Sequence, residues 1–177
     1  DRNTGGIVIA AKNAEALRIM NEKVKDRELE KTYLAAVMGR PKPASGRLEG
    51  YLFKDAKKNQ VYVYDSPRPG ARTAVTEYKT LAVRGDLTLV ECHLITGRTH
   101  QIRAQFRHAG CPLLGDGKYG SERDNRSFGE KGQALCSWRL RFDFTTPAGT
   151  LEYLNGREFS APVPDFVTKY FPGVSLG

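Results

Sequence analysis

In residues 87–95, successive side chains fall alternately into two sets, one for each face of an extended chain. A glycine and a short amphipathic segment follow shortly after. Alternation with a period of two predicts a β-strand. Gly97 predicts the end of that strand, because glycine adopts positive φ without steric cost. Thr99 is then placed to cap a short helix, with its hydroxyl accepting from the backbone N–H of Gln101 or Ile102. We therefore expect a sheet with this helix packed against it.

The predicted helix has an apolar side and a basic side, because residues three, four and seven positions apart share one side of a helix. The apolar side consists of Ile102, Phe106 and Ala109, and the basic side of His100, Arg103 and Arg107. Two interpretations are open for the basic side. It is either a solvated surface or a surface with an anionic partner, and that partner is a phosphate chain or a carboxylate from elsewhere in the chain.

Other segments of the chain predict further strands beside residues 87–95. The expected strands cover residues 7–11, 30–37, 48–53, 61–64, 73–83 and 135–144, and we expect residues 150–154 to pair with the last of them. Lys31 and Tyr33 share a face of their strand and are candidates to line a cleft, although a half-buried strand tyrosine is the more common case.

Two helices are expected in addition to the one that follows residues 87–95. Asn13 predicts the start of a helix over residues 14–24 with Leu17, Met20 and Val24 on its buried side, and residues 164–170 predict a closing helix. Residues 121–132 are polar and carry no clear pattern. The predicted fold is therefore α+β, a largely antiparallel mixed sheet with a few flanking helices.

The formal net charge of +8 at pH 7 favours a polyanionic partner, and nucleic acid over a membrane. No apolar run is long enough to span a bilayer, and the first residues do not resemble a signal peptide. Cys92, Cys111 and Cys136 are widely spaced and lack a paired ligand pattern, so we interpret them as reduced core residues and expect no metal site. We expect a cytoplasmic monomer.

Three segments, taken together, resemble the RluA-type pseudouridine synthases. They are Asp1-Arg2-Asn3-Thr4-Gly5-Gly6, Lys31-Thr32-Tyr33-Leu34-Ala35 and Thr96-Gly97-Arg98-Thr99-His100-Gln101-Ile102-Arg103. Their order and approximate separations match that family, and the segment from Gly110 to Asp116 resembles the one that follows the last motif there. The resemblance covers nearly the whole chain. Its most specific part is His-Gln-Ile-Arg with its flanks, whereas Lys-x-Tyr alone is a weak signal.

The resemblance implies an enzyme that isomerises uridine to pseudouridine in ribosomal RNA, or alternatively in transfer RNA. It makes Asp1 the catalytic aspartate, Tyr33 the active-site tyrosine and Arg103 the arginine that pairs with Asp1. The residues expected to contact RNA are Arg2, Lys31, Arg98, His100 and Arg107. The reaction moves the uracil from an N- to a C-glycosidic bond without a redox step, so no cofactor is implied.

One departure from the family concerns the start of the chain. In the family a His-Arg-Leu sequence normally precedes the aspartate, and nothing precedes Asp1 here. We therefore expect residues 1–177 to form one catalytic domain that is incomplete at its N-terminus.

Two other functions compete with this one. A non-catalytic RNA-binding module would keep the fold and the basic cleft, but the joint presence of Asp1, Tyr33 and Arg103 argues against it. A glycoside hydrolase would need a second, suitably separated acid, and none stands out.

Overall fold

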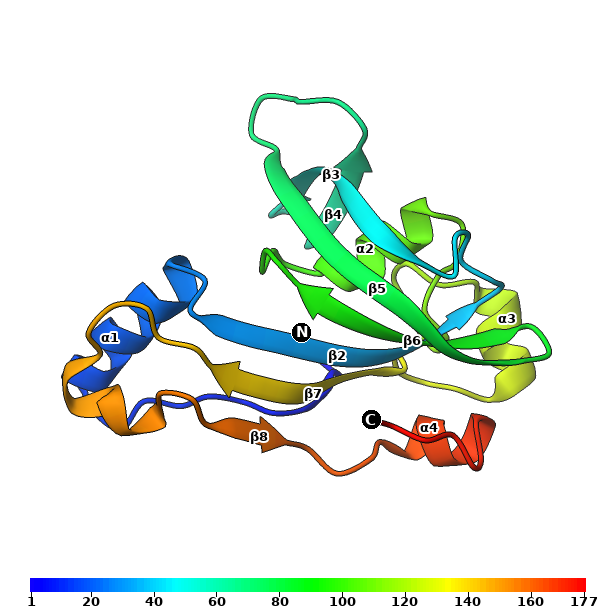
Figure 1. Ribbon diagram of the computed structural model, residues 1–177. Helices are drawn as coiled ribbons and strands as arrows, with labels where there is room; N and C mark the ends of the chain where they lie inside the picture. The colour runs from blue at the N-terminus through cyan, green and yellow to red at the C-terminus, as the bar shows by residue number, and fades with distance from the viewer.

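One twisted, eight-stranded sheet forms the body of the protein (Figure 1), and the computed structural model describes all of residues 1–177. Its strands are β1 (Gly5–Gly6), β2 (Leu29–Met38), β3 (Ser45–Asp55), β4 (Gln60–Tyr64), β5 (Arg72–Arg84), β6 (Leu87–Leu94), β7 (Leu135–Phe142) and β8 (Glu158–Ser160). Their order in the sheet is β1-β7-β2-β6-β5-β3-β4, with β8 on β7. Only β1 runs parallel to its neighbour. The predicted α+β class is confirmed.

Four α-helices and one 3₁₀-helix flank the sheet. They are α1 (Ala14–Lys25), α2 (Gln101–His108), α3 (Glu122–Phe128), η1 (Gly149–Leu154) and α4 (Asp165–Tyr170). Asn13 caps α1 as predicted, since its side chain accepts from the backbone N–H of Ala16 at 2.8 Å. No helix combines the length and the apolar composition that crossing a bilayer requires.

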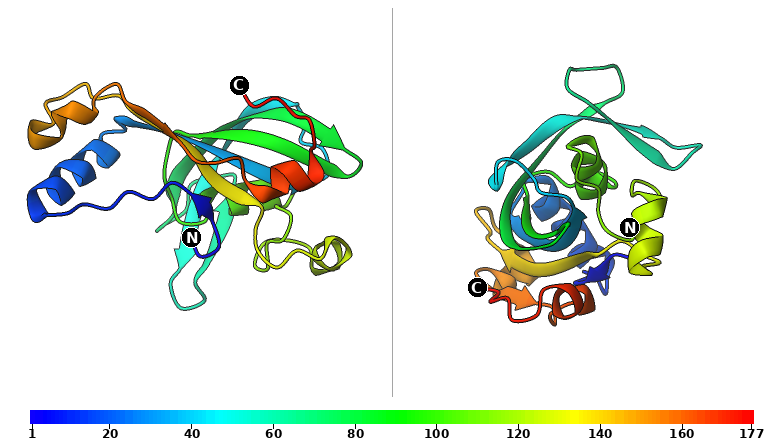
Figure 2. Two further views of the ribbon diagram at one scale, coloured as in Figure 1. Left: turned by 90° about the horizontal axis from the view of Figure 1, so that it is seen from below. Right: turned by 90° about the vertical axis from the view of Figure 1, so that its right-hand side faces the viewer.

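The two faces of the sheet carry separate cores, because successive side chains of β2 point in opposite directions. Ala35 and Val37 pack with Ile102 and Phe106 of α2. Leu34 and Ala36 face the other way and belong to the core that contains Val167 and Phe171 at α4. The helices α2 and α4 therefore lie on opposite sides of the sheet (Figure 2).

A third core joins α1 to η1 at one end of the sheet (left in Figure 1). The predicted buried side of α1 is wrong in two of its three positions: Met20 is buried, but Leu17 and Val24 are 52% and 44% exposed. Ile19 and Lys23 are buried instead. The buried side of α1 includes Lys23 because its ammonium group pairs with the buried carboxylate of Glu28. A pattern of apolar residues does not reveal a buried lysine.

Two further predictions are wrong, and strand pairing along one edge of β7 explains both. Residues 7–11 are not a buried strand: β1 ends at Gly6, and Val8 is 87% exposed. The chain leaves β7 here because β8 occupies the adjoining part of the same edge, where Leu140 pairs with Phe159. Residues 150–154, which were expected on this edge, form η1, and Leu151 packs into the third core.

Residues 121–132, which showed no pattern in the sequence, contain α3. Ser121 caps this helix by accepting from the backbone N–H of Asp124, and Gly129 ends it in the left-handed conformation. None of the residues of α3 is buried, so no apolar periodicity marked it.

A buried ion pair supports the third core and makes stability depend on pH. Lys23 Nζ donates to Glu28 Oε2 at 2.6 Å and to the carbonyl oxygen of Thr146 at 2.5 Å. The hydrogen bond from Lys23, with smaller contributions from Thr145 and Thr146, lowers the pKa of Glu28 from 4.5 to about 2 against the opposing effect of burial. A depressed carboxyl pKa stabilises the folded state above the unfolded value and loses that contribution as pH falls toward the folded value.

We therefore expect the urea midpoint to fall between about pH 4.5 and pH 2, and this part of the fall should be absent in Glu28→Gln. Urea unfolding of both proteins across that range is the measurement. Equal pH dependence of the two midpoints would show that Glu28 is not responsible.

Candidate active site

A buried polar network, built on Gln101, fixes the start of α2. Gln101 Oε1 accepts from the Thr96 hydroxyl at 2.7 Å and from the backbone N–H of Arg98 at 3.0 Å. Its Nε2 donates to the Thr76 hydroxyl at 2.8 Å and to the carbonyl oxygen of Val75 at 3.0 Å, both in β5. The predicted capping role of Thr99 is wrong. The side chain of Gln101 orders the turn before α2 instead. The sequence did not indicate this role, because a capping residue normally precedes its helix.

His100 occupies the position before α2 in an unusual backbone conformation. Its φ of 52° lies in the left-handed region, and its side chain makes no capping hydrogen bond. Residues other than glycine adopt this region at a cost, and such residues cluster at functional sites. The conformation directs the imidazole of His100 into the interior, where only 7% of the residue is exposed.

Arg103 has a buried carboxylate partner that the sequence motifs did not identify. Its Nε donates to Asp116 Oδ2 at 2.7 Å, and its Nη2 donates to Asp116 Oδ1 at 2.9 Å. Asp116 is fully buried and Arg103 is 6% exposed. A two-point pairing of this kind fixes the plane of the guanidinium group. Of the two interpretations of the basic side, a carboxylate from elsewhere in the chain is confirmed for Arg103.

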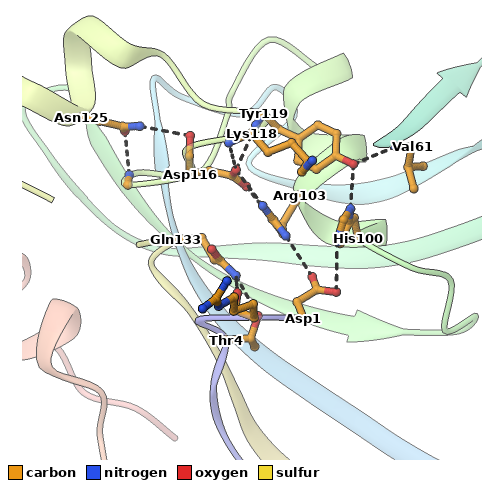
Figure 3. A network of polar contacts seen from close by, with 12 residues as sticks. Asp1, Thr4, Val61, His100, Arg103, Asp116, Lys118, Tyr119, Asn125 and Gln133 are labelled. Carbon is orange, nitrogen blue, oxygen red and sulfur yellow. Dashed lines mark hydrogen bonds and ion pairs between the residues drawn. The ribbon is translucent and has the colours of Figure 1, made fainter. Parts of the chain in front are cut away.

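The backbone around Asp116 completes this pairing (Figure 3). Asp116 Oδ1 also accepts from the backbone N–H groups of Lys118 and Tyr119, both at 2.9 Å. Burial alone would raise the pKa of Asp116, but Arg103 and these two N–H groups hold it below its ordinary value. Asn125 of α3 secures the loop by donating to the carbonyl oxygen of Asp116 at 3.0 Å.

Asp1 lies on the free side of the same guanidinium group. Its Oδ2 is 3.5 Å from Arg103 Nη1, and its Oδ1 is 3.8 Å from His100 Nε2 (Figure 3). Gln133 holds this end of the chain by donating to the carbonyl oxygen of Arg2 at 2.6 Å and to the Thr4 hydroxyl at 3.2 Å. The expected approach of Asp1 to Arg103 is present, although the shortest contacts of Arg103 go to Asp116.

The path from Asp1 into the sheet depends on Gly6. Gly6 has a φ of 96°, and a Cβ atom there would stand 2.1 Å from the carbonyl oxygen of Ser137 in β7. No other residue fits this close approach without moving the strand. Gly6 therefore allows β1 to join β7 and bring Asp1 to Arg103.

Asp1 opens into a small cleft of about 110 Å³, which we call the Asp1 cleft. Tyr33, His100 and Arg98 contribute to its lining, together with Leu94 and Ile102. Tyr33 is half-buried on β2, and the side chain of Asp1 remains 20% exposed. A carboxylate, an imidazole and a phenol ring thus share one accessible cavity, and a guanidinium group lies behind the carboxylate.

A chain of hydrogen bonds reaches His100 through the Tyr119 hydroxyl. The backbone N–H of Val61 donates to the Tyr119 hydroxyl oxygen at 2.8 Å, and that hydroxyl lies 2.8 Å from His100 Nδ1. With Val61 donating to its oxygen, the hydroxyl is placed to donate its own hydrogen to Nδ1, and we infer that the imidazole carries its hydrogen on Nε2, facing Asp1. Burial, followed by the charges of Arg103 and Lys118, lowers the pKa of His100 to about 4.

We expect His100 to stay neutral far below the pH at which an ordinary histidine gains its proton, about 6.5. Because the unfolded chain binds that proton first, this residue should reduce stability as pH falls from about 6.5 toward 4. Two-dimensional ¹H–¹⁵N NMR of the imidazoles should show hydrogen on Nε2 alone. In Tyr119→Phe, which lacks the donor to Nδ1, the other tautomer should appear; an unchanged spectrum would contradict the assignment.

The remaining residues predicted to contact RNA lie in different places. Arg2 and Arg107 are exposed, and Arg98 and Lys31 are half-buried. His100 is a buried, neutral part of the Asp1 cleft and not a surface cation. The three cysteines are free and buried, as expected. Asp116 ends the Gly110 to Asp116 segment that resembles the family, but the sequence indicated no role for it or for Tyr119, although Asp116 is the only acidic residue between Glu91 and Glu122.

Comparison with known proteins identifies the family of the chain. The family model described as RNA pseudouridylate synthase matches residues 1–108. An uncharacterised RNA pseudouridine synthase of Bacillus subtilis is 36% identical over 165 residues, which cover 93% of this chain and 50% of that protein. A ribosomal large subunit pseudouridine synthase C of Escherichia coli O157:H7 is 32% identical over 168 residues, which cover 93% of this chain and 51% of that protein.

The fold is also shared with a solved structure. Human RNA pseudouridylate synthase domain containing 1 superposes with a TM-score of 0.75 at 22% identity, over 96% of this chain and 69% of that one. The chain spans about half the length of the curated relatives that it matches. Because the family model covers more than half of its residues, the chain belongs to the RNA pseudouridylate synthase family.

Proposed function

We propose that the protein converts specific uridines in RNA to pseudouridine, with Asp1 as the catalytic carboxylate. The observation that carries the proposal is the carboxylate of Asp1 in an accessible cleft, 3.5 Å from a buried arginine and beside Tyr33. Membership of the family supports the reaction type.

The steps of the isomerisation explain why a carboxylate is needed. The bond between N1 of uracil and C1′ of ribose must break, the base must turn, and C5 must join C1′. C5 then loses a proton, and N1 gains one. An ionised carboxylate acts as a nucleophile in this sequence or stabilises positive charge that develops at C1′. Arg103 favours the ionised form of Asp1, and Asp116 holds Arg103 in place.

Tyr33 is proposed to stack on the uracil or to relay the C5 proton, since it lines the same cleft as Asp1. The target nucleotide must leave its helix or loop, because C1′ and C5 are not accessible in a stack. The reaction has no net redox change, and we propose that it proceeds without a cofactor.

We propose ribosomal RNA as the substrate and transfer RNA as the second candidate. Two relatives are described as ribosomal large subunit pseudouridine synthases, C in Escherichia coli and D in Borreliella burgdorferi. We place the protein in the cytoplasm, where reducing conditions keep the thiols of its three buried cysteines free.

Mapping of pseudouridine by mass spectrometry in cells that lack the gene tests this function. We expect the loss of pseudouridine at one or a few ribosomal positions, with recovery when the gene is restored. Loss in transfer RNA alone would favour the second substrate. An unchanged map in both RNAs would overturn the proposed reaction and favour a non-catalytic RNA-binding module.

Phosphate contacts by Arg98 and Arg107 should appear as a salt dependence. Each lost contact should reduce the slope of log affinity against log salt by about one, because one fewer counterion is released. RNA binding by Arg98→Ala and Arg107→Ala over a salt series is the measurement, with Arg84→Ala at the far end of β5 as a control. Slopes equal to that of the control would place both arginines on the solvated surface.

A further inference from the structure

A second, larger cavity lies next to the Asp1 cleft. It has a volume of about 430 Å³, within the range of small-molecule sites, and the end of α1, the start of β2 and the loop after β6 enclose it. Leu94 and Arg98 line both this cavity and the Asp1 cleft. We call the larger cavity the Lys31 groove. The two cavities therefore adjoin at these two side chains.

The Lys31 groove has an excess of positive charge. Lys25, Arg27, Lys31 and Arg98 line it, against a single carboxylate from Glu30. None of these four cations takes part in any of the ion pairs of the structure. Arg98 Nε donates to the carbonyl oxygen of Thr73 at 3.1 Å, but no carboxylate of the chain neutralises any of the four charges.

Lys31 gives the clearest sign of a missing partner. Its side chain is half-buried, and burial lowers its pKa because the ammonium group loses water without gaining a counterion. A Cβ atom at Gly97 would stand 3.2 Å from Lys31 Nζ, so the glycine lets the ammonium group lie close against the loop that leads to Arg98. An anion in the groove would restore the interactions that burial removes.

One wall of the groove is apolar. Val24, which projects from α1 with 44% exposure, lines it together with Leu94 and Ile95. Val24 is one of the residues that the apolar pattern of α1 assigned to the core. A ligand of the groove therefore combines an anionic group with a flat or apolar one, as a nucleotide does.

We propose that the Lys31 groove binds the nucleotide adjacent to the target uridine, with its phosphate at Lys31 and Arg98 and its base against Val24. The proposal rests on the proposed function, because it takes RNA as the substrate. An acidic peptide would also match the charge. RNA is favoured because the groove adjoins the Asp1 cleft at Leu94 and Arg98, at a distance that one strand can bridge between neighbouring nucleotides.

Binding of modified trinucleotides tests each half of the groove separately. The probe is a fluorescent RNA trinucleotide with a central uridine, and its affinity is measured at low salt. A neutral methylphosphonate replaces the phosphate on the 5′ or the 3′ side of that uridine, and an abasic residue replaces the base on either side. No step of this measurement requires turnover.

We expect the methylphosphonate on one side to weaken wild-type binding about tenfold or more, the effect of losing a charge-assisted contact. In Lys31→Met the same modification should change affinity less than about twofold, because the charge it would meet is gone. Val24→Ala should likewise remove most of the penalty of the abasic residue on that side. Arg84→Met, far from the groove, should keep both wild-type penalties.

Equal penalties in wild type and Lys31→Met on both sides would overturn the proposal, as would the absence of trinucleotide binding by the wild type. An NMR comparison on the wild type alone provides a second test. The amide signals of Gly97 and Arg98 should respond to the phosphodiester and not to the methylphosphonate on that side. Groove-dependent binding without pseudouridine formation would instead retain the site and reject the proposed reaction.

Discussion

Replacement of Asp1 by asparagine should abolish pseudouridine formation and leave RNA affinity within about tenfold of the wild type, or about 1.4 kcal/mol. The amide keeps the shape of the side chain but removes the charge and the nucleophile. Affinity should persist because phosphate contacts dominate RNA binding, and Asp1 lies inside the cleft between Arg103 and His100. Activity and affinity measured on the same preparation separate the two effects.

Asp165→Asn is a matched control, since Asp165 is an exposed carboxylate at the start of α4, on the other side of the sheet. It should retain activity and affinity. Mass spectrometry of the Asp1→Asn protein must exclude deamidation back to aspartate. Turnover by an intact Asp1→Asn protein would remove Asp1 from the chemistry and return the RNA-binding module to consideration.

Replacement of Asp116 by alanine should destabilise the protein by about 3–5 kcal/mol, the usual effect of removing one partner of a buried ion pair. Arg103 is 6% exposed, and its two shortest contacts go to Asp116. Without Asp116 its charge would remain buried with Asp1 alone, at 3.5 Å. Urea unfolding measures the loss, and a urea midpoint close to the wild-type value would show that the pair is not needed for stability.

The double variant Arg103→Met, Asp116→Ala distinguishes stability from activity. Removing both charges eliminates the unpaired buried ion, so the double variant should be more stable than Asp116→Ala. It should nevertheless stay inactive, because Asp1 has lost its arginine. Activity in the double variant would mean that Arg103 serves the fold and not the reaction.

The sheet was predictable because its strands alternate locally. Residues 48–53, 61–64 and 73–83 each fall within an observed strand, and the cap at Asn13 follows from a side chain three residues from its partner. The errors arose where distant segments compete. Whether residues 7–11 stay on β7 depends on β8, which arrives about 150 residues later, and no local pattern carries that information.

The candidate site was likewise predictable only in part. The motifs named Asp1, Tyr33 and Arg103. The fold brings Asp1 and Tyr33 to one cleft with Arg103 behind Asp1, but the motifs did not name the groups that hold these residues. Asp116 and Tyr119 lie in a glycine-rich segment without periodicity, so only a search for the carboxylate that Arg103 lacked would have found the first of them. The burial of His100 depends on a backbone conformation that residue type alone does not indicate.

Gly6 has a consequence for how inactive variants are interpreted. Its hydrogen atom occupies a space in which a methyl carbon would overlap the carbonyl oxygen of Ser137. A larger residue there must displace β1, and with it the carboxylate of Asp1, while the cores on both faces of the sheet keep their contacts. A genetic screen would score such a variant as a chemical defect. Its cause would be the spacing between two backbones, at a position that has no functional group of its own.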